Sequence, residues 1–390
     1  MRVIRHPSTV SDWDDDRRRA RLRETRGGRG RFARIVTRAT PALLPLVVLA
    51  AQYWKFDVQP ERERLAHTHP QLHAVHDAVS PRDRDTAVVD LVGLGNLDAT
   101  ETARTLDSLA GLGQVWAVQY DNSGIDTAVI ADLVRQRAED EGVDTVVLSG
   151  HSMGGVIALE VARHLYTETD LVVSGVILDS TPIDLHAVRA ESRDAGEEML
   201  RWIGWIPGAR ESRSVRFAVE TAARKDRFVT RDAGLPGIDV HEFFDVVDEV
   251  MREKIASDRA ASNGLIESQF KTIVASGAAG DLSALAHDVD GKPRPGVVFL
   301  RPRQGIDDQV VDVDYSQRIL YDRSGGPRGS LRVVRMAGTG HANPNQAPDA
   351  YNAAIAEKVV PFLRDRAGEL PDTAVLAERA ASQQEPGDVP

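Results

Sequence analysis

The chain has 390 residues, of which 42% are hydrophobic and 27% charged, and its formal net charge is −11. This composition supports a large globular core and excludes wholesale disorder. Cysteine is absent, which excludes disulfides, thiolate metal sites and a cysteine nucleophile. The negative charge argues against a nucleic-acid partner, because phosphate binding needs clustered Lys and Arg.

The first sixty residues differ from the rest of the chain. Residues 1–40 are rich in arginine and lack a periodic apolar stripe, which is typical of a solvated arm. The apolar run at 41–56 is shorter than the roughly 20 residues of a spanning helix, yet it has basic residues before it and aromatic residues at its end. Three interpretations stay open: a membrane anchor through residues 38–56, an interfacial helix, or a helix docked on the core. We favour the anchor, with a cytoplasmic protein as the alternative.

Residues 61–85 carry a histidine cluster. On a helix, His69, His73 and His76 would share one face and could hold zinc. No carboxylate is placed to complete such a site, so we predict a solvent-facing helix or linker here, without a metal.

From residue 86 onward, strands and helices alternate. Short β-branched runs predict buried strands, and the longer segments between them predict helices. This alternation is typical of a mostly parallel sheet with helices on both faces. The predicted strands span 87–92, 114–120, 145–148, 171–178, 296–300 and 331–336, and the predicted helices span 98–112, 125–141, 153–166 and 348–366.

A long segment at 183–292 interrupts this alternation and is mostly helical in pattern. Its Trp202, Ile203, Trp205, Ile206, Phe243 and Phe244 favour an apolar pocket, although core packing would explain them equally well. The predicted organisation is an arm with an apolar segment (1–60), a linker or helix (61–85), a core in two parts (86–182 and 293–366), the helical insertion (183–292) and a loose tail (367–390).

The strongest local signal is a serine between a strand and a helix. The strand at 145–148 runs into Gly150-His-Ser152-Met-Gly154, and a helix follows at once. In such a turn the serine is strained and exposed at the sheet edge, while glycines let neighbouring backbone approach. The N–H of Met153, at the helix start, would point at a developing oxyanion.

A serine nucleophile needs a base that is oriented by an acid. Asp308 follows the strand at 296–300, and His341 follows the strand at 331–336. Both therefore lie at carboxyl ends of strands, where open α/β sheets place their sites. Asp307 and Asp179 remain alternatives for the acid.

These motifs resemble those of the α/β-hydrolase superfamily, over roughly residues 86–366. The resemblance rests on Gly150-His-Ser-Met-Gly-Gly155, on Gly305-x-x-Asp308-x-x-Val311 and on Gly340-His341-Ala342, with the insertion where that family carries a lid. It implies that Ser152 is the nucleophile, His341 the general base and Asp308 the orienting acid. It also implies a second oxyanion donor in the loop after the first strand, for which we choose the N–H of Leu94.

The resemblance further implies a substrate that is an ester or a related acyl compound, small or lipid-like, and a reaction through an acyl-enzyme without a cofactor. Acyl transfer to an alcohol would use the same residues. Two antiparallel strands usually open this fold, but none is recognisable in residues 50–85, so we expect about six strands.

Two function classes compete with this interpretation. The Gly93-Leu-Gly95 loop imitates a dinucleotide-binding turn, but Asp98 puts a carboxylate where a pyrophosphate needs positive potential. The other alternative is a catalytically silent, hydrolase-like binding protein. The intact set of serine, histidine and aspartate argues against it.

Overall fold

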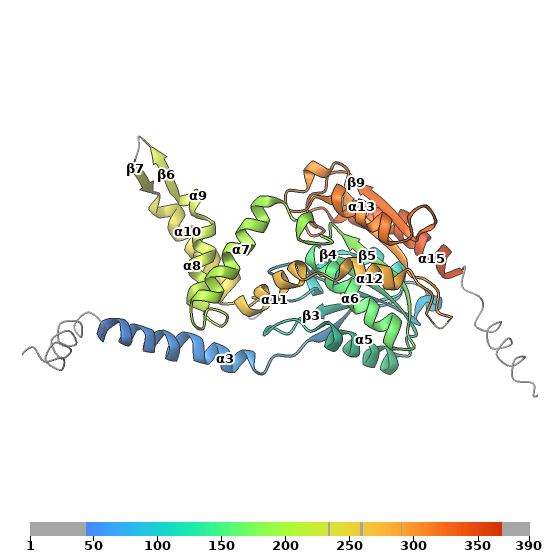
Figure 1. Ribbon diagram of the computed structural model, residues 1–390, viewed down its shortest axis with the longest axis horizontal. Helices are drawn as coiled ribbons and strands as arrows, with labels where there is room; N and C mark the ends of the chain where they lie inside the picture. Colours follow the sequence, from blue (N-terminus) through green and yellow to red (C-terminus); the bar gives the residue numbers. More distant parts are fainter. Residues whose placement is uncertain (1–43, 233–234, 258–259, 290, 369–390) are drawn as a thin grey trace, which may run out of the picture. The chain divides into compact units, whose positions relative to one another are not determined.

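The computed structural model in Figure 1 describes residues 44–232, 235–257, 260–289 and 291–368. The chain divides into two units, residues 1–60 and residues 61–390. The described part of the first unit is helical, with an α-helix over 44–53 and a π-helical turn at Trp54–Val58. Nowhere in the described ranges is a helix both long enough and apolar enough to cross a membrane. Residues 38–43 of the predicted anchor lie outside those ranges.

The second unit is built on a seven-stranded sheet in the order β1-β3-β2-β4-β5-β8-β9. All neighbouring strands are parallel except β1, which pairs antiparallel with β3. The sequence-based prediction of a mostly parallel sheet is confirmed. The strands are β1 (Gln71–His76), β2 (Thr86–Leu91), β3 (Gln114–Gln119), β4 (Thr145–His151), β5 (Val172–Asp179), β8 (Gly296–Pro302) and β9 (Leu331–Met336).

The helix or linker predicted at 61–85 is wrong over β1, and so is the count of six strands. Residues 71–76 pair with β3, from Gln71 opposite Gln119 onward. The edge of β3 offers backbone N–H and C=O groups that need partners, and this tertiary demand overrides the local pattern. The helical face that zinc would have required does not form. Instead His73 Nε2 lies 3.1 Å from the side-chain oxygen of Gln119, and His76 Nε2 lies 3.2 Å from Ala103 O.

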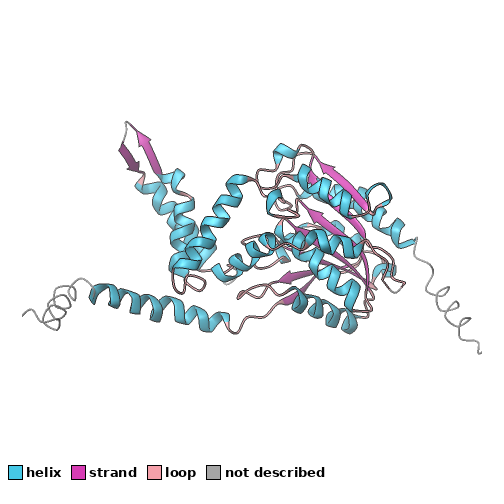
Figure 2. Ribbon diagram, in the orientation of Figure 1, coloured by secondary structure: helices cyan, strands magenta, loops and turns pink. Residues whose placement is uncertain are grey.

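Helices cover the sheet, as Figure 2 shows by colour. Helix α6 packs against β4 and β5 with α5 and α12 beside it, while α14 and α15 contact β9, β5 and β8. The single helix predicted at 98–112 is broken into α4 and a 3₁₀ turn at Asp107–Gly111. The helices of this layer are α4 (Thr100–Thr105), α5 (Thr127–Glu141), α6 (Met153–Glu168), α12 (Ala278–Leu285), α13 (Val313–Arg323), α14 (Pro348–Ala354) and α15 (Val360–Gly368).

The strand β4 and the helix α6 lie at the centre of the core. Six of the seven residues of β4 are buried, and α6 is buried around most of its circumference. A strand covered on both faces reads as a continuous apolar run, and a helix that is apolar all round belongs inside. The β4–α6 junction therefore lies at the buried centre of the fold.

Between β5 and β8 the chain leaves the sheet and forms the insertion (residues 183–292). Its α11 packs against α6 and α7, which joins the insertion to the core. A hairpin of β6 (Val229–Asp232) and β7 (Leu235–Ile238) interrupts the helices, and the sequence pattern did not predict it. The helices of the insertion are α7 (Ala190–Trp205), α8 (Arg213–Ala223), α9 (Lys225–Phe228), α10 (Val240–Val250) and α11 (Asn263–Val274), followed by α12, which packs on α6 in the layer that covers the sheet.

The apolar residues that the sequence singled out in this insertion divide into two groups. Phe243 packs edge-to-face on Phe228, with ring centroids 5.2 Å apart, in a small core of the insertion itself. Ile203 is buried and Ile206 is half-buried, whereas Trp202, Trp205 and Phe244 are exposed. Core packing therefore explains only part of this set.

Candidate active site

Ser152 occupies a sharp turn between β4 and α6. Its φ of 53° and ψ of −123° lie where a non-glycine residue is strained. The turn needs close backbone packing, because a Cβ on Gly150 would overlap the backbone of Gly154 and Gly155. The Ser152 N–H donates to Asp179 O at 2.7 Å, so the end of β5 holds the turn in place. The strand–turn–helix context expected from the sequence is thus present.

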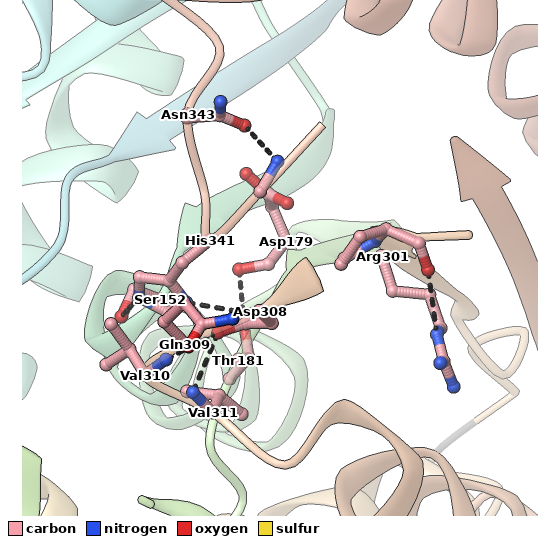
Figure 3. Close-up of polar contacts among 12 residues, drawn as sticks. Ser152, Asp179, Thr181, Arg301, Asp308, Gln309, Val310, Val311, His341 and Asn343 are labelled. Atoms are coloured by element: carbon pink, nitrogen blue, oxygen red, sulfur yellow. Dashed lines mark hydrogen bonds and ion pairs between the residues drawn. The ribbon is translucent and has the colours of Figure 1, made fainter. Parts of the chain in front are cut away.

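Three side chains from different strand ends meet at this turn, as predicted. His341 Nε2 lies 2.8 Å from Ser152 Oγ, and His341 Nδ1 lies 3.0 Å from Asp308 Oδ2 (Figure 3). Asp308 is fully buried, while the side chain of His341 is 19% exposed. The imidazole is therefore held between a buried carboxylate and a hydroxyl that borders a cavity.

Asp308 is held as a carboxylate by its surroundings. Burial by itself would raise the pKa of Asp308. The hydrogen bond and the charge of His341, together with hydrogen bonds from the N–H groups of Val310 and Val311, outweigh the burial and lower the pKa. Arg189, from the start of the insertion, donates to the backbone oxygens of Asp308 and Gly305 at 2.7 and 2.8 Å. The loop that carries Asp308 is thus held by its own backbone N–H groups and by Arg189 of the insertion.

The two alternative acids lie elsewhere. Asp307 is exposed, although it is adjacent in sequence. Asp179 uses its two oxygens for other partners, His151 Nδ1 at 2.9 Å and the Tyr351 hydroxyl at 3.1 Å. Of the three candidates, Asp308 is the one in contact with His341.

The loop after β2 approaches the serine directly. A Cβ on Gly93 would come 3.0 Å from His151 O and 3.2 Å from Ser152 Cβ. Leu94 follows and lines the same cavity as Ser152. Met153 is the first residue of α6, so its N–H is among those that an α-helix leaves without an intrahelical partner. Both predicted oxyanion donors therefore belong to segments beside Ser152.

The Gly93–Gly95 loop also tests the dinucleotide alternative. It packs on the serine turn, and Asp98 Oδ1 accepts from the Thr100 N–H at 2.8 Å at the start of α4. The carboxylate thus takes the helix N-terminus that a pyrophosphate would use.

Within the described residues, no group of three or more His, Asp or Glu side chains has an arrangement that could hold a metal ion.

Two cavities meet at the loop residue Leu94. The first has a volume of about 450 Å³ and is bordered by Ser152 and His341 together with residues of the insertion such as Phe270 and Ile273. The second, of about 230 Å³, lies among α7, α8 and α11. Its apolar lining comprises Leu94, Met199, Trp202, Ile203, Val215, Val219 and Ile266.

Sequence reasoning missed a buried polar cluster beside the serine. His151 lies between two carboxylates, with Nδ1 2.9 Å from Asp179 and Nε2 3.1 Å from Asp90. Burial alone would lower the pKa of His151, but the two carboxylates outweigh it and raise the pKa to about 10. Asp90 and Asp179 are polar residues near the ends of otherwise apolar strands, and this was the available signal.

This cluster reaches the loop that carries His341. The Tyr351 hydroxyl donates to Asp179 and accepts from the Asn343 N–H at 3.1 Å, and the Asn343 side chain accepts from the Gly340 N–H at 3.0 Å. Burial and the charge of Asp179 raise the pKa of Tyr351, so its hydroxyl stays protonated and can donate.

The order of the strands, the helices on both faces and the serine turn at the end of β4 are those of the α/β-hydrolase fold. The model of the alpha/beta hydrolase family matches residues 65–354, and the chain belongs to this family. The protein is accordingly an enzyme of the hydrolase class. No curated protein matches the sequence.

Several solved structures resemble the chain. A monoacylglycerol lipase of Paleococcus ferrophilus has 14% identity and a TM-score of 0.44, with 76% of this chain and 99% of the lipase covered. A bacterial membrane phospholipase A has 17% identity and a TM-score of 0.45, with 82% and 98% covered. A hydrolase of Pseudomonas aeruginosa has 12% identity and a TM-score of 0.45, with 75% and 93% covered.

Proposed function

We propose that the protein is a serine hydrolase that cleaves esters with an apolar chain through an acyl-enzyme. The observation that carries this proposal is the position of His341, within hydrogen-bond reach of both Ser152 Oγ and Asp308 Oδ2. A nucleophile, a base and an orienting acid in this relation are the parts that acyl transfer requires.

In the proposed reaction, Ser152 Oγ attacks the ester carbonyl carbon while His341 Nε2 takes the serine proton. The carbonyl C–O π bond becomes a C–O⁻ single bond. When the tetrahedral intermediate collapses, the ester bond breaks and His341 returns the proton to the leaving alcohol. Water then attacks the acyl-serine by the same route, which releases the acid and restores Ser152.

Asp308 and two backbone N–H groups complete this proposal. A carboxylate whose pKa is lowered stays ionised, holds the proton of His341 on Nδ1 and stabilises the imidazolium that forms. The N–H groups of Met153 and Leu94 are the proposed donors to the oxyanion. Donors of this kind act on charge that exists only after attack, and each is worth about 10²- to 10³-fold in rate.

The second cavity supports an apolar chain in the substrate. It adjoins the Ser152 cavity at Leu94, and side chains such as Met199, Ile203 and Val219 make most of its lining apolar, beside the ion pair of Arg216 and Glu220. At roughly 30 Å³ for each water-sized group, its 230 Å³ have room for about eight methylene groups. Burying such a chain contributes roughly 0.8 kcal/mol for each CH₂.

A fluorophosphonate probe tests the proposed nucleophile. We expect the wild-type protein to be labelled on Ser152, as read by mass spectrometry, and to hydrolyse p-nitrophenyl butyrate. Ser152→Ala should lose both properties and keep its thermal midpoint, because the side chain serves chemistry and not packing. Ser174→Ala, a change of the same kind on β5, should keep both. A folded Ser152→Ala protein with full activity would contradict the mechanism.

A further inference from the structure

The insertion sends one buried polar side chain to the loop beside Ser152. Gln269 lies on α11 and is fully buried. Its side-chain oxygen accepts from the Gly95 N–H at 2.8 Å, and its NH₂ group donates to Asn96 O at 2.8 Å. One primary amide thus binds two consecutive residues of the loop, as a neighbouring strand would.

Gln269 gives this loop its two short side-chain hydrogen bonds, whereas the internal hydrogen bonds of the loop are long. Asn96 also forms a β-bridge with Ala260 of the insertion. The Asn96 N–H reaches Gly93 O at 3.3 Å, and the Asn96 side chain reaches Gly93 O and Leu94 O at 3.4 Å. Gly95 adopts a φ of +83°, a conformation that gives the chain its turn here. The two shorter bonds from Gln269 therefore fix the backbone on the far side of Leu94.

The near side of Leu94 is fixed by the serine turn. Gly93 lies against His151 O and Ser152 Cβ, and the Tyr120 hydroxyl donates to Val92 O at 2.8 Å. The Leu94 N–H thus stands between a segment held by the core and a segment held by the insertion. A displacement of Gly95 would change the direction of the Leu94 peptide.

Gln269 is a buried polar residue among apolar neighbours. Leu265, Ile266, Phe270 and Ile273 of the same helix are buried, and α11 also buries the polar side chains of Asn263 and Glu267. A buried amide is tolerated there only when both of its ends are hydrogen-bonded, since an unpaired end costs about 1–3 kcal/mol. Both ends of Gln269 are bonded, and both bonds go to the loop.

We propose that Gln269 is a positioning residue through which the insertion sets the geometry of the oxyanion site. It touches no reacting atom, and it acts by holding Gly95 and Asn96 so that the Leu94 N–H points at the oxyanion. This inference rests on the proposed function. Through Gln269, the insertion would contribute to the rate of the chemical step.

The test compares Gln269→Met with wild-type protein in ester hydrolysis. Methionine has a similar shape but can form neither hydrogen bond, so Gly95 and Asn96 lose their contacts with α11. We expect kcat for p-nitrophenyl butyrate to fall about 10- to 100-fold, with KM within about twofold, because the oxyanion contact exists only in the transition state. The rate of fluorophosphonate labelling should fall with kcat. Gln136→Met, an exposed change of the same kind on α5, should leave both unchanged.

A second variant, Gln269→Glu, keeps the test decisive if the methionine variant does not fold. A glutamate accepts from the Gly95 N–H, but it donates to Asn96 O only when it is protonated. The activity of this variant relative to wild type should therefore rise as the pH is lowered. Because a buried glutamate also destabilises the fold when it is ionised, circular dichroism at each pH measures the folded fraction. A rise in activity per folded molecule supports the positioning role, whereas a rise that only follows the folded fraction contradicts it.

Two results would overturn the inference, and they can be told apart. If the wild-type protein hydrolyses esters and folded Gln269→Met keeps the same kcat, Gln269 does not position the oxyanion site, and the proposed function stands. If the wild-type protein neither hydrolyses esters nor reacts with the fluorophosphonate, the proposed function fails and the role of Gln269 fails with it.

Discussion

Replacing Asp308 with asparagine should remove most of the activity and leave the fold in place. Asp308 Oδ1 accepts from the N–H groups of Val310 at 2.9 Å and Val311 at 2.8 Å, while Oδ2 faces His341. An asparagine must keep its oxygen toward the two N–H groups, so its NH₂ group faces His341 Nδ1. The imidazole then carries its proton on Nε2, where it cannot accept the proton of Ser152.

The size of this effect follows from the role of the tautomer. In serine proteases, the same wrong tautomer lowers kcat about 10⁴-fold. We expect a loss of about 10³- to 10⁴-fold here, equivalent to roughly 4 to 5.5 kcal/mol at about 1.36 kcal/mol for each tenfold step. Asp308 is fully buried and out of reach of the substrate, so KM should change little.

The assay is steady-state hydrolysis of p-nitrophenyl butyrate, with circular dichroism to verify the fold. Asp307→Asn is the matched control, because Asp307 is adjacent and exposed, and its activity should stay within about twofold of wild type. Asp179→Asn should cost less than Asp308→Asn, since Asp179 contacts His151 and Tyr351 and not His341. If Asp308→Asn keeps most of the activity while Asp179→Asn loses it, the reasoning is refuted.

Two further predictions concern the second cavity and the buried histidine. Val219→Trp puts a larger side chain into the cavity among α7, α8 and α11, so kcat/KM for p-nitrophenyl esters with chains of about eight carbons or more should fall roughly tenfold, while that for acetate stays unchanged. The exposed Val129→Trp on α5 is its control, and an unchanged chain-length profile would argue against the cavity as a chain site. His151 has its pKa raised from 6.5 to about 10 by Asp90 and Asp179 against the cost of burial, so its stabilising effect is complete below about pH 6.5 and is lost as the pH rises toward 10. The free energy of urea unfolding should therefore fall more steeply with pH in the wild type than in His151→Asn, and parallel curves would contradict the buried charge.

Much of the fold could be predicted because the strands of its core have recognisable local sequence patterns. The strands β2 to β5 and β8 are short, mostly buried apolar runs, so each is recognisable without its neighbours. The edge strand β9 is only partly buried, and its Leu, Val and Met residues still indicate a strand. The serine turn was equally local, since the glycines of the motif are needed within a few residues of Ser152. The order of Ser152, Asp308 and His341 followed because the carboxyl ends of parallel strands share one edge.

The elements that were missed depend on partners far away in the sequence. Residues 71–76 form a strand because β3 offers an unpaired edge, and the pattern of these six residues alone does not predict a strand. The sequence favoured Asp308 as the acid but left Asp307 and Asp179 open, because only the folded loops after β5 and β8 place each carboxylate relative to His341. The same holds for Gln269, whose two partners lie more than 170 residues earlier in the chain. The sequence by itself thus determined the parallel strands and the serine turn. Only the tertiary structure decided the edge strand β1 and which polar side chains meet around Ser152, because these contacts join segments that no local pattern connects.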